Sequence, residues 1–522
     1  MSLNVNIGLL GHVDSGKTTL ARVLSSIAST AAFDKNPQSK DRGITLDLGF
    51  SALVIEEPPD HLIAEMCDLK KLQLTFVDCP GHASLVRTII GGAQIIDLML
   101  LVIDAQKGIQ TQTAECIVIA GLLKKKVIVV VNKIDLLEEA TRNELLIKLN
   151  KKLQKALNNT SLGINVPIFN VSAQNMINIE ELICGIKSHI HVPKRDITSP
   201  LVLYVDHCFS IKGQGTICTG TIMQGTIKVE DVVEIPSISE QRKVKSIQMF
   251  RQSVSVAEMG DRVGVCVTQF NSKLLERGII TKPGYLHSLY AICIRLNRIE
   301  YFKYDIKSKS KLHCTVGHDT VMANITLFHN VDENSDEQKF NINNEYEYIE
   351  QLEASDTTQN CNQTVFVLLE FEKPIIARTN ATIIASKLDM DIQSNSCRLA
   401  FWGEIEWHTL SKNYISEELP KFKIFKRKVK QGSIQRVSGD NQVIVQNLFK
   451  KEGNRDYYVG KNVELSTGEI GIIESTFGQT SKVKIHFPKG LKNETIQLLL
   501  TKRANEILVY MKLKKYIFNK NL

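Results

Sequence analysis

The segment Gly11–Thr18, GHVDSGKT, constrains this chain more than any other feature of its sequence. It fits the P-loop pattern GxxxxGK[ST], with the β-branched run Val5–Leu10 before it and the helix-forming run Thr19–Ala28 after it. Glycines allow successive backbone N–H groups to turn inward around phosphate oxygens at the positive end of the following helix. Lys17 would reach the β- and γ-phosphates and the Thr18 hydroxyl would ligate Mg²⁺, so the sequence predicts a nucleotide-binding domain.

A second motif supplies the metal side of such a site. The sequence DCPGH, Asp78–His82, directly follows the expected strand Gln73–Val77. The Asp78 carboxylate can hold the Mg²⁺ shell through water, and the Gly81 N–H can sense the γ-phosphate. An isolated DxxG is only a turn, whereas here it follows the P-loop in the required order.

Two later motifs predict that the base is guanine. Asn132–Asp135, NKID, follows the next core strand, and the Asp135 carboxylate offers two acceptors to the guanine N1–H and N2–H groups, which adenine lacks. Ser172 and Ala173 close the last strand, where a backbone N–H could meet the guanine O6. The predicted GTP-binding residues are Gly11, His12, Val13, Asp14, Ser15, Gly16, Lys17, Thr18, Thr19, Asp78, Gly81, Asn132, Lys133, Asp135, Ser172 and Ala173.

The pattern along the 522 residues predicts a multidomain α/β + β chain. Residues 1–196 alternate β-branched runs with helical patterns, as in a parallel sheet flanked by helices, and 197–284 reads as a β-barrel after a proline-containing linker. A second barrel is expected at 285–418, interrupted by an acidic surface insertion at 330–364. Residues 419–522 are expected to form a basic, β-rich domain with turns at Ser438–Asn441, Ser466–Gly468 and Phe487–Gly490.

Positive charge is concentrated in the last fifth of the chain. Pro420–Leu522 holds 21 Lys and Arg against 8 Asp and Glu, whereas the remainder holds 43 against 48. Such a segment can bind nucleic acid or a ribonucleoprotein through phosphate contacts, and a solvated lysine-rich surface is the alternative. The candidate RNA- or partner-binding residues are Lys423, Lys426, Arg427, Lys428, Lys430, Lys450 and Lys451.

The cysteines and the apolar runs exclude two other classes of protein. The chain has 11 cysteines and no CxxC pair, which indicates free thiols in a reducing compartment and neither a disulfide framework nor a zinc site. No apolar stretch reaches the roughly 18 residues that cross a bilayer, and the N-terminal sequence lacks the basic region of a signal peptide. We therefore expect a cytoplasmic location, with a nuclear pool also allowed, and no membrane partner.

Together, GHVDSGKT, RGIT at Arg42–Thr45, DCPGH and NKID resemble the nucleotide-binding domain of translational GTPases. The resemblance implies hydrolysis of GTP to GDP and phosphate, with Thr45 closing over Mg²⁺ and the γ-phosphate and His82 positioning the attacking water. It implies Mg²⁺ ligation by Thr18, Thr45 and, through water, Asp78. It also suggests a monovalent cation near Asp14.

Longer segments resemble the selenocysteine-specific elongation factors of eukaryotes, within the elongation factor Tu-like GTPases. The resemblance to the elongation factor Tu barrel is carried by Val205–Ile222 and Gly260–Gly264, and that to the narrower family by Ser29–Phe50, Val77–Asp104 and Thr268–Gly278. It implies GTP-dependent delivery of selenocysteinyl-tRNA to the ribosome at recoded UGA codons. It further implies that the basic domain meets the selenocysteine-insertion RNA element or its RNA-binding protein, and that the factor acts as a monomer.

The amino-acid pocket of the second domain is expected to be cationic. By resemblance to general aminoacyl-tRNA carriers, the pocket positions are Asp206, His207 and Arg262, where His and Arg replace acid and amide. A selenol is more acidic than a thiol of pKa about 8.5, so selenocysteine should be largely ionised at neutral pH. A charge pair ~4 Å apart at an effective dielectric of 20 is worth at most about 4 kcal/mol. A structural salt bridge between Arg262 and Asp206 is the alternative.

Three other functions fit part of the sequence. The γ subunit of initiation factor two shares the GTP-binding domain and barrels but would not need Arg262 or the basic domain. The GTPase subunit of a sulfate-activating enzyme shares the three-domain plan but gives the basic domain no role. A non-hydrolysing RNA-binding scaffold is disfavoured because both Thr45 and His82 are present.

Overall fold

The computed structural model of the chain describes residues 2–28, 48–81, 86–163, 165–211, 213, 215–275, 277–317, 319–331, 339–354, 364–390, 396–439, 441–449, 458–477, 482–500 and 506–519. The predicted site residues Thr45, His82, Lys450 and Lys451 lie outside these ranges. The chain divides into two compact units, the first made of Met1–Leu327, Asp336–Phe340 and Glu350–Tyr414, and the second of Phe328–Ser335, Asn341–Ile349 and Ile415–Leu522. In the described part of the chain, no helix has the length and apolar character needed to span a membrane.

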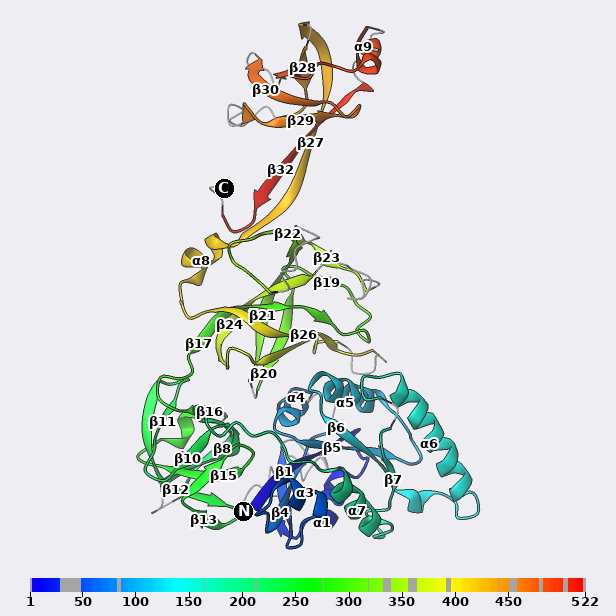
Figure 1. Cartoon of the computed structure of the whole chain (residues 1–522), viewed down its shortest axis with the longest axis vertical. Helices are drawn as coiled ribbons and strands as arrows, with labels where there is room; N and C mark the ends of the chain where they lie inside the picture. The colour runs from blue at the N-terminus through cyan, green and yellow to red at the C-terminus, as the bar shows by residue number, and fades with distance from the viewer. Residues whose placement is uncertain are drawn as a thin grey trace. The chain divides into compact units, whose positions relative to one another are not determined.

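The first unit opens with a seven-stranded sheet in the order β2-β3-β4-β1-β5-β6-β7 (Figure 1). Strands β4, β1, β5, β6 and β7 are parallel, and β3 and β2 are added antiparallel at one edge. The strands are β1 Ser2–Gly11, β2 Ile27–Ala28, β3 Gly49–Ile55, β4 Lys71–Asp78, β5 Leu98–Asp104, β6 Lys126–Asn132 and β7 Ile168–Asn170. The expected parallel α/β domain is confirmed.

Helices cover both faces of this sheet, which is why every residue of the central strand β5 is buried and all but its last, Asp104, are apolar. One core cluster packs α4, α5 and α6 on one face, and another packs α1, α3 and α7 on the other. The helices are α1 Lys17–Leu24, α3 Asp60–Glu65, α4 Val86–Gln94, α5 Thr111–Leu122, α6 Arg142–Asn158 and α7 Ile179–His189. The predicted helix Thr19–Ala28 was wrong at both ends. The helix starts at Lys17 and stops before Ser25, which is extended, and Ile27–Ala28 pairs with β3 instead.

Two β-barrels follow in the same unit. In the first, β11-β16-β8-β9-β15-β12 closes through a β11–β12 pairing, and β10 pairs with β14. Its strands are β8 Val202–Ile211, β9 Gly215–Gln224, β10 Thr226–Lys228, β11 Val232–Ile235, β12 Glu240–Met249, β13 Gln252–Val254, β14 Val256–Glu258, β15 Arg262–Val267 and β16 Gly278–Thr281. In the second, β20-β25-β26-β17-β24-β21 closes through a β20–β21 pairing. Its strands are β17 Ser288–Arg295, β18 Asn297–Arg298, β19 Ile306–Lys307, β20 Lys311–Val316, β21 Asp319–Asn330, β23 Gln351–Leu352, β24 Val365–Ile376, β25 Thr382–Ser386 and β26 Leu399–Thr409.

Buried polar contacts join the second barrel to its neighbours within this unit. The Arg398 guanidinium donates to both carboxylate oxygens of Glu115 on α5, at 2.9 and 2.7 Å, and both side chains are buried. Arg378 and Tyr285 hold the side-chain amide of Gln224 in the first barrel. Breaking one partner of a buried ion pair typically costs about 3–5 kcal/mol, so Glu115 and Arg398 resist separation of the two domains.

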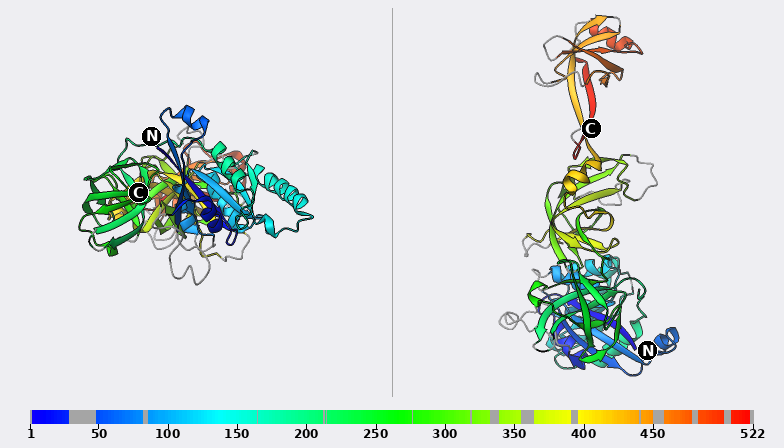
Figure 2. Two further views of the ribbon diagram at one scale, coloured as in Figure 1. Left: turned by 90° about the horizontal axis from the view of Figure 1, so that it is seen from below. Right: turned by 90° about the vertical axis from the view of Figure 1, so that its left-hand side faces the viewer.

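The second unit is a β-structure in which β27-β28-β31-β30-β29-β32 closes through a β27–β32 pairing. Its elements are β22 Glu345–Ile349, α8 Tyr414–Glu417, β27 Lys423–Gly439, β28 Gln442–Gln446, β29 Asn462–Leu465, β30 Ile470–Phe477, β31 Lys482–His486, α9 Asn493–Leu500 and β32 Leu508–Tyr516. The long antiparallel pair β27 and β32 is drawn in Figure 1 and again in Figure 2. Two of the three turns predicted in this region are confirmed, because Ser466–Gly468 lies between β29 and β30 and Phe487–Gly490 follows β31. The other, Ser438–Asn441, includes residue 440, which lies outside the described residues, and Ser438 and Gly439 belong to β27.

The predicted surface insertion at 330–364 needs correction. Its described residues form β22, which pairs in parallel with the start of β27, and β23, which pairs with β19. Tyr346 and Leu352 are buried, and the Tyr346 ring packs edge-on against Phe328. The prediction was wrong because it treated the acidic residues as solvated, whereas two of them form ion pairs with basic residues of β27 and β32. Glu347 pairs with Arg427, and Glu345 pairs with Lys514.

Candidate functional site

The P-loop lies between β1 and α1 with the backbone that its glycines permit. Asp14 and Gly16 have φ of 60° and 88°, in the left-handed region that lets the chain turn back on itself. Gly16 is the N-cap of α1, so the first N–H groups of the helix point into the loop. This is the geometry by which a helix N-terminus binds phosphate.

Lys17 and Gly81 both pack against the backbone of the P-loop. The buried Lys17 Nζ donates to the carbonyl oxygens of His12 at 2.6 Å and Gly11 at 3.2 Å. Burial lowers the pKa of the Lys17 ammonium, and the nearby Asp78 carboxylate opposes that shift. A Cβ on Gly81 would lie 2.8 Å from the backbone nitrogen of Val13 and 2.9 Å from the backbone carbon of His12, so a side chain at this position of the DxxG motif would force the P-loop backbone to shift.

The two predicted Mg²⁺-binding residues that the structure describes lie together. The Thr18 hydroxyl donates to Asp78 Oδ2 at 2.7 Å, across the gap between α1 and the end of β4. A hydroxyl beside a carboxylate is an oxygen donor set that suits Mg²⁺. The third predicted ligand, Thr45, is outside the described residues, as is the predicted catalytic residue His82.

Asn132 holds the base side of the site together. Its buried amide donates to the carbonyl of Ser15 at 3.0 Å and accepts from the backbone N–H of Ala173 at 3.0 Å. The P-loop and the loop after β7 are therefore fixed to the same side chain. This bridging role is a function of Asn132 that the sequence analysis did not assign.

The Asp135 carboxylate is available to a ligand within this arrangement. Its Oδ1 atom is buried and has no hydrogen-bond partner among the described residues. An unpaired buried oxygen is costly unless a ligand supplies a donor, and the N–H groups of guanine are such donors. The neighbouring Lys133 forms an ion pair with Asp104 at 3.0 Å. Burial alone would raise the pKa of Asp104, but the Lys133 hydrogen bond and backbone N–H groups hold it below its usual value.

One predicted contact is not available in this geometry. The Ser172 N–H donates to the carbonyl of Ile177 at 3.1 Å, and the Ala173 N–H donates to Asn132. Both backbone donors that were expected to meet the guanine O6 are thus already used. Ala173 does lie at the site, where its N–H helps to orient the Asn132 side chain.

The predicted amino-acid pocket brings Asp206 and Arg262 together. The register between β8 and β9 shifts between Val205 and His207, so Asp206 lies at a β-bulge, a feature that re-aims a side chain. It forms a buried ion pair with Arg262 Nη1 at the start of β15. His207 is half-buried on the same strand. The salt-bridge alternative is therefore present in the structure.

The Arg262 guanidinium also stacks on an aromatic ring, and one of its nitrogen atoms has no hydrogen-bond partner among the described residues. Its carbon Cζ lies 3.5 Å from the centroid of the Phe50 ring, which belongs to β3 of the nucleotide-binding domain. Its Nη2 atom is buried and has no hydrogen-bond partner among the described residues. A cation stacked on a ring is stabilised without hydrogen bonds, which leaves a directional donor unused.

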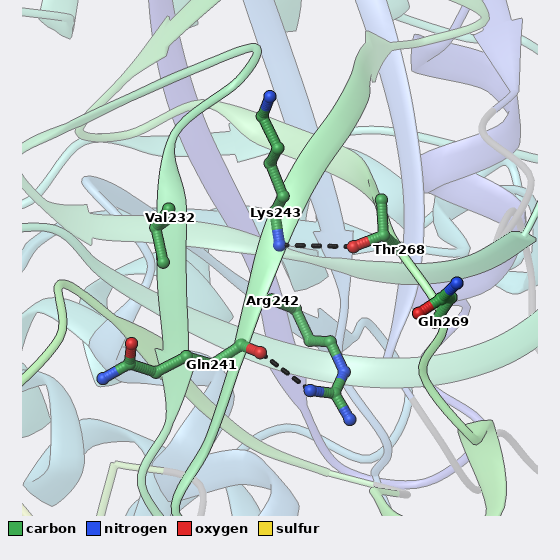
Figure 3. Close-up of a pocket in the computed structure, with 6 residues that line it drawn as sticks. All are labelled: Val232, Gln241, Arg242, Lys243, Thr268 and Gln269. Atoms are coloured by element: carbon green, nitrogen blue, oxygen red, sulfur yellow. Dashed lines mark hydrogen bonds between the residues drawn. The ribbon is translucent and has the colours of Figure 1, made fainter.

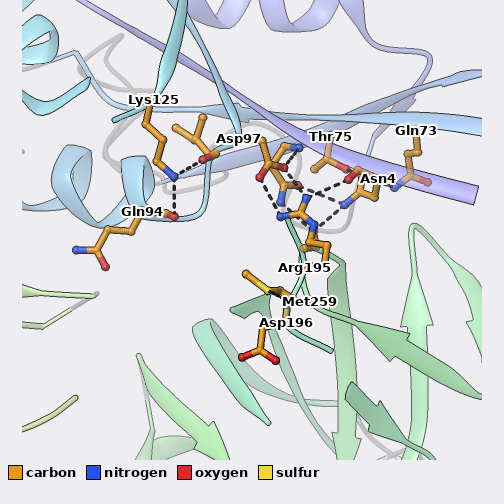
Figure 4. A network of polar contacts seen from close by, with 12 residues as sticks. Asn4, Gln73, Thr75, Gln94, Asp97, Lys125, Arg195, Asp196 and Met259 are labelled. Carbon is orange, nitrogen blue, oxygen red and sulfur yellow. Dashed lines mark hydrogen bonds and ion pairs between the residues drawn. The ribbon is translucent and has the colours of Figure 1, made fainter. Parts of the chain in front are cut away.

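A polar network fixes the turn that carries Arg262 (Figure 4). The amides of Asn4 and Asn6 on β1 both donate to the carbonyl of Gly260, at 2.7 and 2.8 Å. Arg195, in the linker between the domains, binds both oxygens of Asp97 at 2.9 and 2.6 Å and the carbonyl of Asn4. The strand that ends in the P-loop therefore also anchors the barrel turn. No pattern in the sequence distinguished these residues from an ordinary polar strand end.

The same barrel has a polar pocket of about 300 Å³ (Figure 3). It is lined by Val232, Gln241, Arg242, Lys243, Thr268 and Gln269. Its two cations are already paired, Arg242 with Glu240 and Lys243 with Glu230. None of the predicted site residues lines it, so we assign it no ligand.

The predicted basic residues of the C-terminal domain that the structure describes lie on β27. Lys423, Arg427 and Lys428 are exposed, and Lys426 and Lys430 are half-buried. Lys430 lies over the rings of Phe449 and Tyr458, at 4.5 and 4.1 Å from their centroids. The pairing with β32 places Arg427 opposite Lys514 and Lys426 opposite Lys515. The predicted cluster is thus one strand of a basic two-stranded ribbon, and the lysines of β32 belong to it.

Family models match most of the chain. The model for the elongation factor Tu GTP binding domain matches residues 2–192, and that for elongation factor Tu domain 2 matches 215–280. The model for the third domain of eukaryotic selenocysteine-specific elongation factors matches 293–403, and the model for the eEFSec C-terminal RIFT domain matches 420–521.

Whole-chain relatives agree with these matches. The selenocysteine-specific elongation factor of Mus musculus is 48% identical over 95% of this chain and 90% of its own length, and that of Methanocaldococcus jannaschii is 34% identical over 91% and 92%. The crystal structure of SelB from Methanococcus maripaludis with the GTP analogue GPPNHP is similar at a TM-score of 0.71, with 26% identity over 99% of this chain and 100% of that chain. The alternative functions are not favoured. The chain therefore belongs to the eukaryotic selenocysteine-specific elongation factors, translational GTPases that hydrolyse GTP and deliver selenocysteinyl-tRNA to the ribosome.

Proposed function

We propose that the nucleotide is held as the P-loop geometry suggests. The backbone N–H groups of residues 11–19 bind the phosphates, Lys17 binds the β- and γ-phosphates, and Asp135 binds guanine. Thr18, Asp78 and Thr45 hold Mg²⁺, which neutralises phosphate charge when it is bound. His82 orients the attacking water. Two contacts support this assignment: Gly16 is the N-cap of α1 at the P-loop, and the Thr18 hydroxyl donates to the Asp78 carboxylate.

We propose that Asp206, His207 and Arg262 select the selenocysteinyl side chain. The observation that carries this proposal is the unpaired, buried Nη2 of Arg262. Asp206 holds one end of the guanidinium and orients the other end, so that Nη2 can donate to a selenolate. Because Asp206 neutralises most of the long-range charge, the gain is that of one hydrogen bond to a charged group, about 1.5–3 kcal/mol. That is smaller than the ceiling of about 4 kcal/mol for an unpaired arginine.

The position of Phe50 ties this selection to the nucleotide-binding domain. Arg262 is almost completely buried under the Phe50 ring, so a ligand reaches Nη2 only after this packing changes. Phe50 lies on β3 directly opposite Val77, one residue before Asp78 on β4. A change in the position of Asp78 on nucleotide binding would therefore move the strand that covers Arg262. We propose that GTP opens the pocket by this route.

The test is to measure binding of selenocysteinyl- and seryl-tRNA, on the same tRNA body, to the GTP-bound Arg262→Ala protein. We expect the selenocysteinyl form to lose about tenfold to 150-fold in affinity and the seryl form to change little, since serine offers no charge to lose. His207→Ala should act in the same direction and more weakly, because His207 is only half-buried and solvent screens it more than the buried Arg262. A parallel loss for both forms would contradict the proposed pocket.

We further propose that the basic ribbon of β27 and β32 contacts the selenocysteine-insertion RNA or its RNA-binding protein, in a monomeric factor of the cytoplasm. Side chains alternate between the two faces of a strand, so Lys426, Lys428 and Lys430 lie on one face of the ribbon. Lys515, directly opposite Lys426, lies on the same face, and this row of cations could follow a phosphate backbone. Affinity for single-stranded RNA should then fall with salt at a slope near −0.7 per contact. A salt-independent interaction would favour a protein surface as the partner.

A further inference from the structure

Two cysteines face each other beside the proposed selenocysteine pocket. Cys208 on β8 is paired in register with Cys218 on β9, and their sulfur atoms lie 3.6 Å apart. Cys208 follows His207 directly, and His207 follows the bulge at Asp206. Cys208 is half-buried, whereas Cys218 is completely buried. One thiol can therefore be reached from solvent and the other lies behind it.

The backbone already has a geometry that accepts a disulfide. Directly opposite residues of an antiparallel pair have Cα atoms about 4.5–5.5 Å apart, within the range of about 4.4–6.8 Å found in disulfides. Bond formation would bring the two sulfur atoms about 1.5 Å closer, to roughly 2.05 Å. Rotation of the two side chains and a small approach of the strands are enough for that, and no element has to unfold.

The pKa values of the two thiols are shifted in opposite directions, so that the more accessible thiol is the one that ionises more easily. The hydrogen bond from Cys218 lowers the pKa of the Cys208 thiol, against the opposing effect of burial. The same contact, together with burial, raises the pKa of the Cys218 thiol. The accessible cysteine is thus the better thiolate, and thiolates are the nucleophiles that attack peroxides.

We propose that Cys208 and Cys218 form a redox-sensitive site, in which a hydroperoxide converts the two thiols to a cross-strand disulfide that weakens binding of the aminoacyl group. The Cys208 thiolate attacks one peroxide oxygen, the O–O bond breaks, and a sulfenic acid and hydroxide are formed. The Cys218 sulfur then bonds to the Cys208 sulfur and displaces the sulfenic oxygen, which leaves as water with the Cys218 proton. In sum, two thiols and one hydrogen peroxide give one disulfide and two molecules of water.

The effect on the pocket follows from the connections of His207, and it depends on the proposed function of this pocket. The Thr219 hydroxyl, next to Cys218, donates to the carbonyl of His207 at 3.4 Å. Drawing Cys208 and Cys218 together therefore moves the residues that flank the bulge. Displacements of about 1 Å in a binding constellation can cost up to about 100-fold, and we expect a loss of about tenfold or more. The reduced pair would mark the state competent for binding.

The experiment uses the full-length protein, treated with hydrogen peroxide that is then removed, or kept reduced. Peptide mapping by mass spectrometry under non-reducing conditions should find Cys208 linked to Cys218. Affinity for selenocysteinyl-tRNA, reduced and desalted under argon, should be about tenfold lower or more for the oxidised protein and should recover after dithiothreitol. This comparison on the wild-type protein does not depend on any variant that could fail to fold.

Variants separate this pair from other thiols. Cys208→Ser and Cys218→Ala should each retain the affinity of the reduced protein after peroxide treatment, whereas Cys67→Ser with Cys184→Ser, which removes two exposed thiols, should still respond. Failure to find the 208–218 link, an unchanged affinity despite the link, or an equal loss in Cys208→Ser would overturn the proposal. The pocket itself is tested separately by Arg262→Ala in the reduced protein, so the two ideas can fail independently.

Discussion

The nucleotide-binding motifs and the proposed amino-acid pocket of this chain are built in different ways. The nucleotide site is made largely of backbone groups at strand and helix ends, and its short motifs are contiguous in the sequence. The pocket is made of charged side chains, Asp206 and Arg262, that come from two strands and meet inside a barrel. Backbone groups at strand and helix ends need glycines and helix caps to adopt the required geometry. Two charged side chains inside a barrel must instead be removed from water, and their mutual attraction has to offset that free-energy cost.

This difference predicts whether a substitution at each site should lower ligand affinity, protein stability or both. At the predicted nucleotide site, Lys17 contacts only backbone carbonyl oxygens in the printed hydrogen bonds, and one Asp135 oxygen has no hydrogen-bond partner among the described residues. Loss of either side chain should therefore affect ligand binding before it affects folding. The Asp206–Arg262 pair joins two strands of its own barrel and is also proposed to contact the ligand. Its loss should therefore affect folding and binding together.

The largest effect is expected for Lys17→Ala. Because its Nζ lies inside the P-loop, no neighbouring side chain can replace its charge at the phosphates. GTP and GDP binding should become undetectable by isothermal titration, with little change in the folded structure by circular dichroism. Lys126→Ala, which removes an exposed lysine at the start of β6, is the matched control and should bind normally. Retained nucleotide binding by the Lys17 variant would remove the lysine from the phosphate site.

The next effect is a change of base preference in Asp135→Asn. The substitution turns two acceptors into one acceptor and one donor, so guanine loses a partner and xanthine, with an oxo group at C2, gains one. We expect GTP affinity to fall by about 10- to 100-fold and XTP to bind better than GTP in a competition assay.

Asn132→Ala sharpens this test, because its amide bridges Ser15 and Ala173. That variant should lose affinity for both bases and also lower the melting temperature. If Asp135→Asn behaved in the same way, Asp135 would be a structural residue.

The sequence made these two sites predictable to different degrees. Motifs of the nucleotide site report backbone geometry, so the strands, the P-loop and the Thr18–Asp78 contact could be predicted from residue order alone. By contrast, the contact of Phe50 with Arg262 and the anchoring of Gly260 by Asn4 depend on how domains pack, which no local pattern records. The strand β22 was missed for a related reason: its acidic residues look solvated until their basic partners on β27 and β32 are known.

For the pocket, Asp206→Ala should destabilise the protein even without a ligand. It leaves the Arg262 cation buried and unpaired, which typically costs about 3–5 kcal/mol. Glu240→Ala, which breaks the half-exposed pair with Arg242 in the same barrel, should cost at most about 1 kcal/mol. Urea denaturation of both variants measures the difference. Equal, small losses would mean that the Asp206–Arg262 pair adds nothing to the stability of the barrel.

The smallest effect concerns Asp261, which lies between the anchored Gly260 and Arg262. Burial raises the pKa of its carboxyl to about 6, although the Glu258 N–H and the nearby Arg195 act against the shift. An acid whose folded pKa is raised binds more protons folded than unfolded, so its contribution to stability is greatest below about pH 4 and is lost as the pH rises to about 6.

Asp261→Asn removes this titration while its amide oxygen can still accept from Glu258. At pH 7 the variant should therefore be more stable than the wild type by about 1–3 kcal/mol, or a few degrees in melting temperature, and the difference should vanish near pH 4. The matched control is Asp231→Asn, because Asp231 accepts from the Lys228 N–H in the same type of turn but is exposed. Melting curves of both variants between pH 4 and pH 7 decide the matter: a gain at pH 7 in both, or in neither, would mean that burial beside the pocket does not penalise the Asp261 charge.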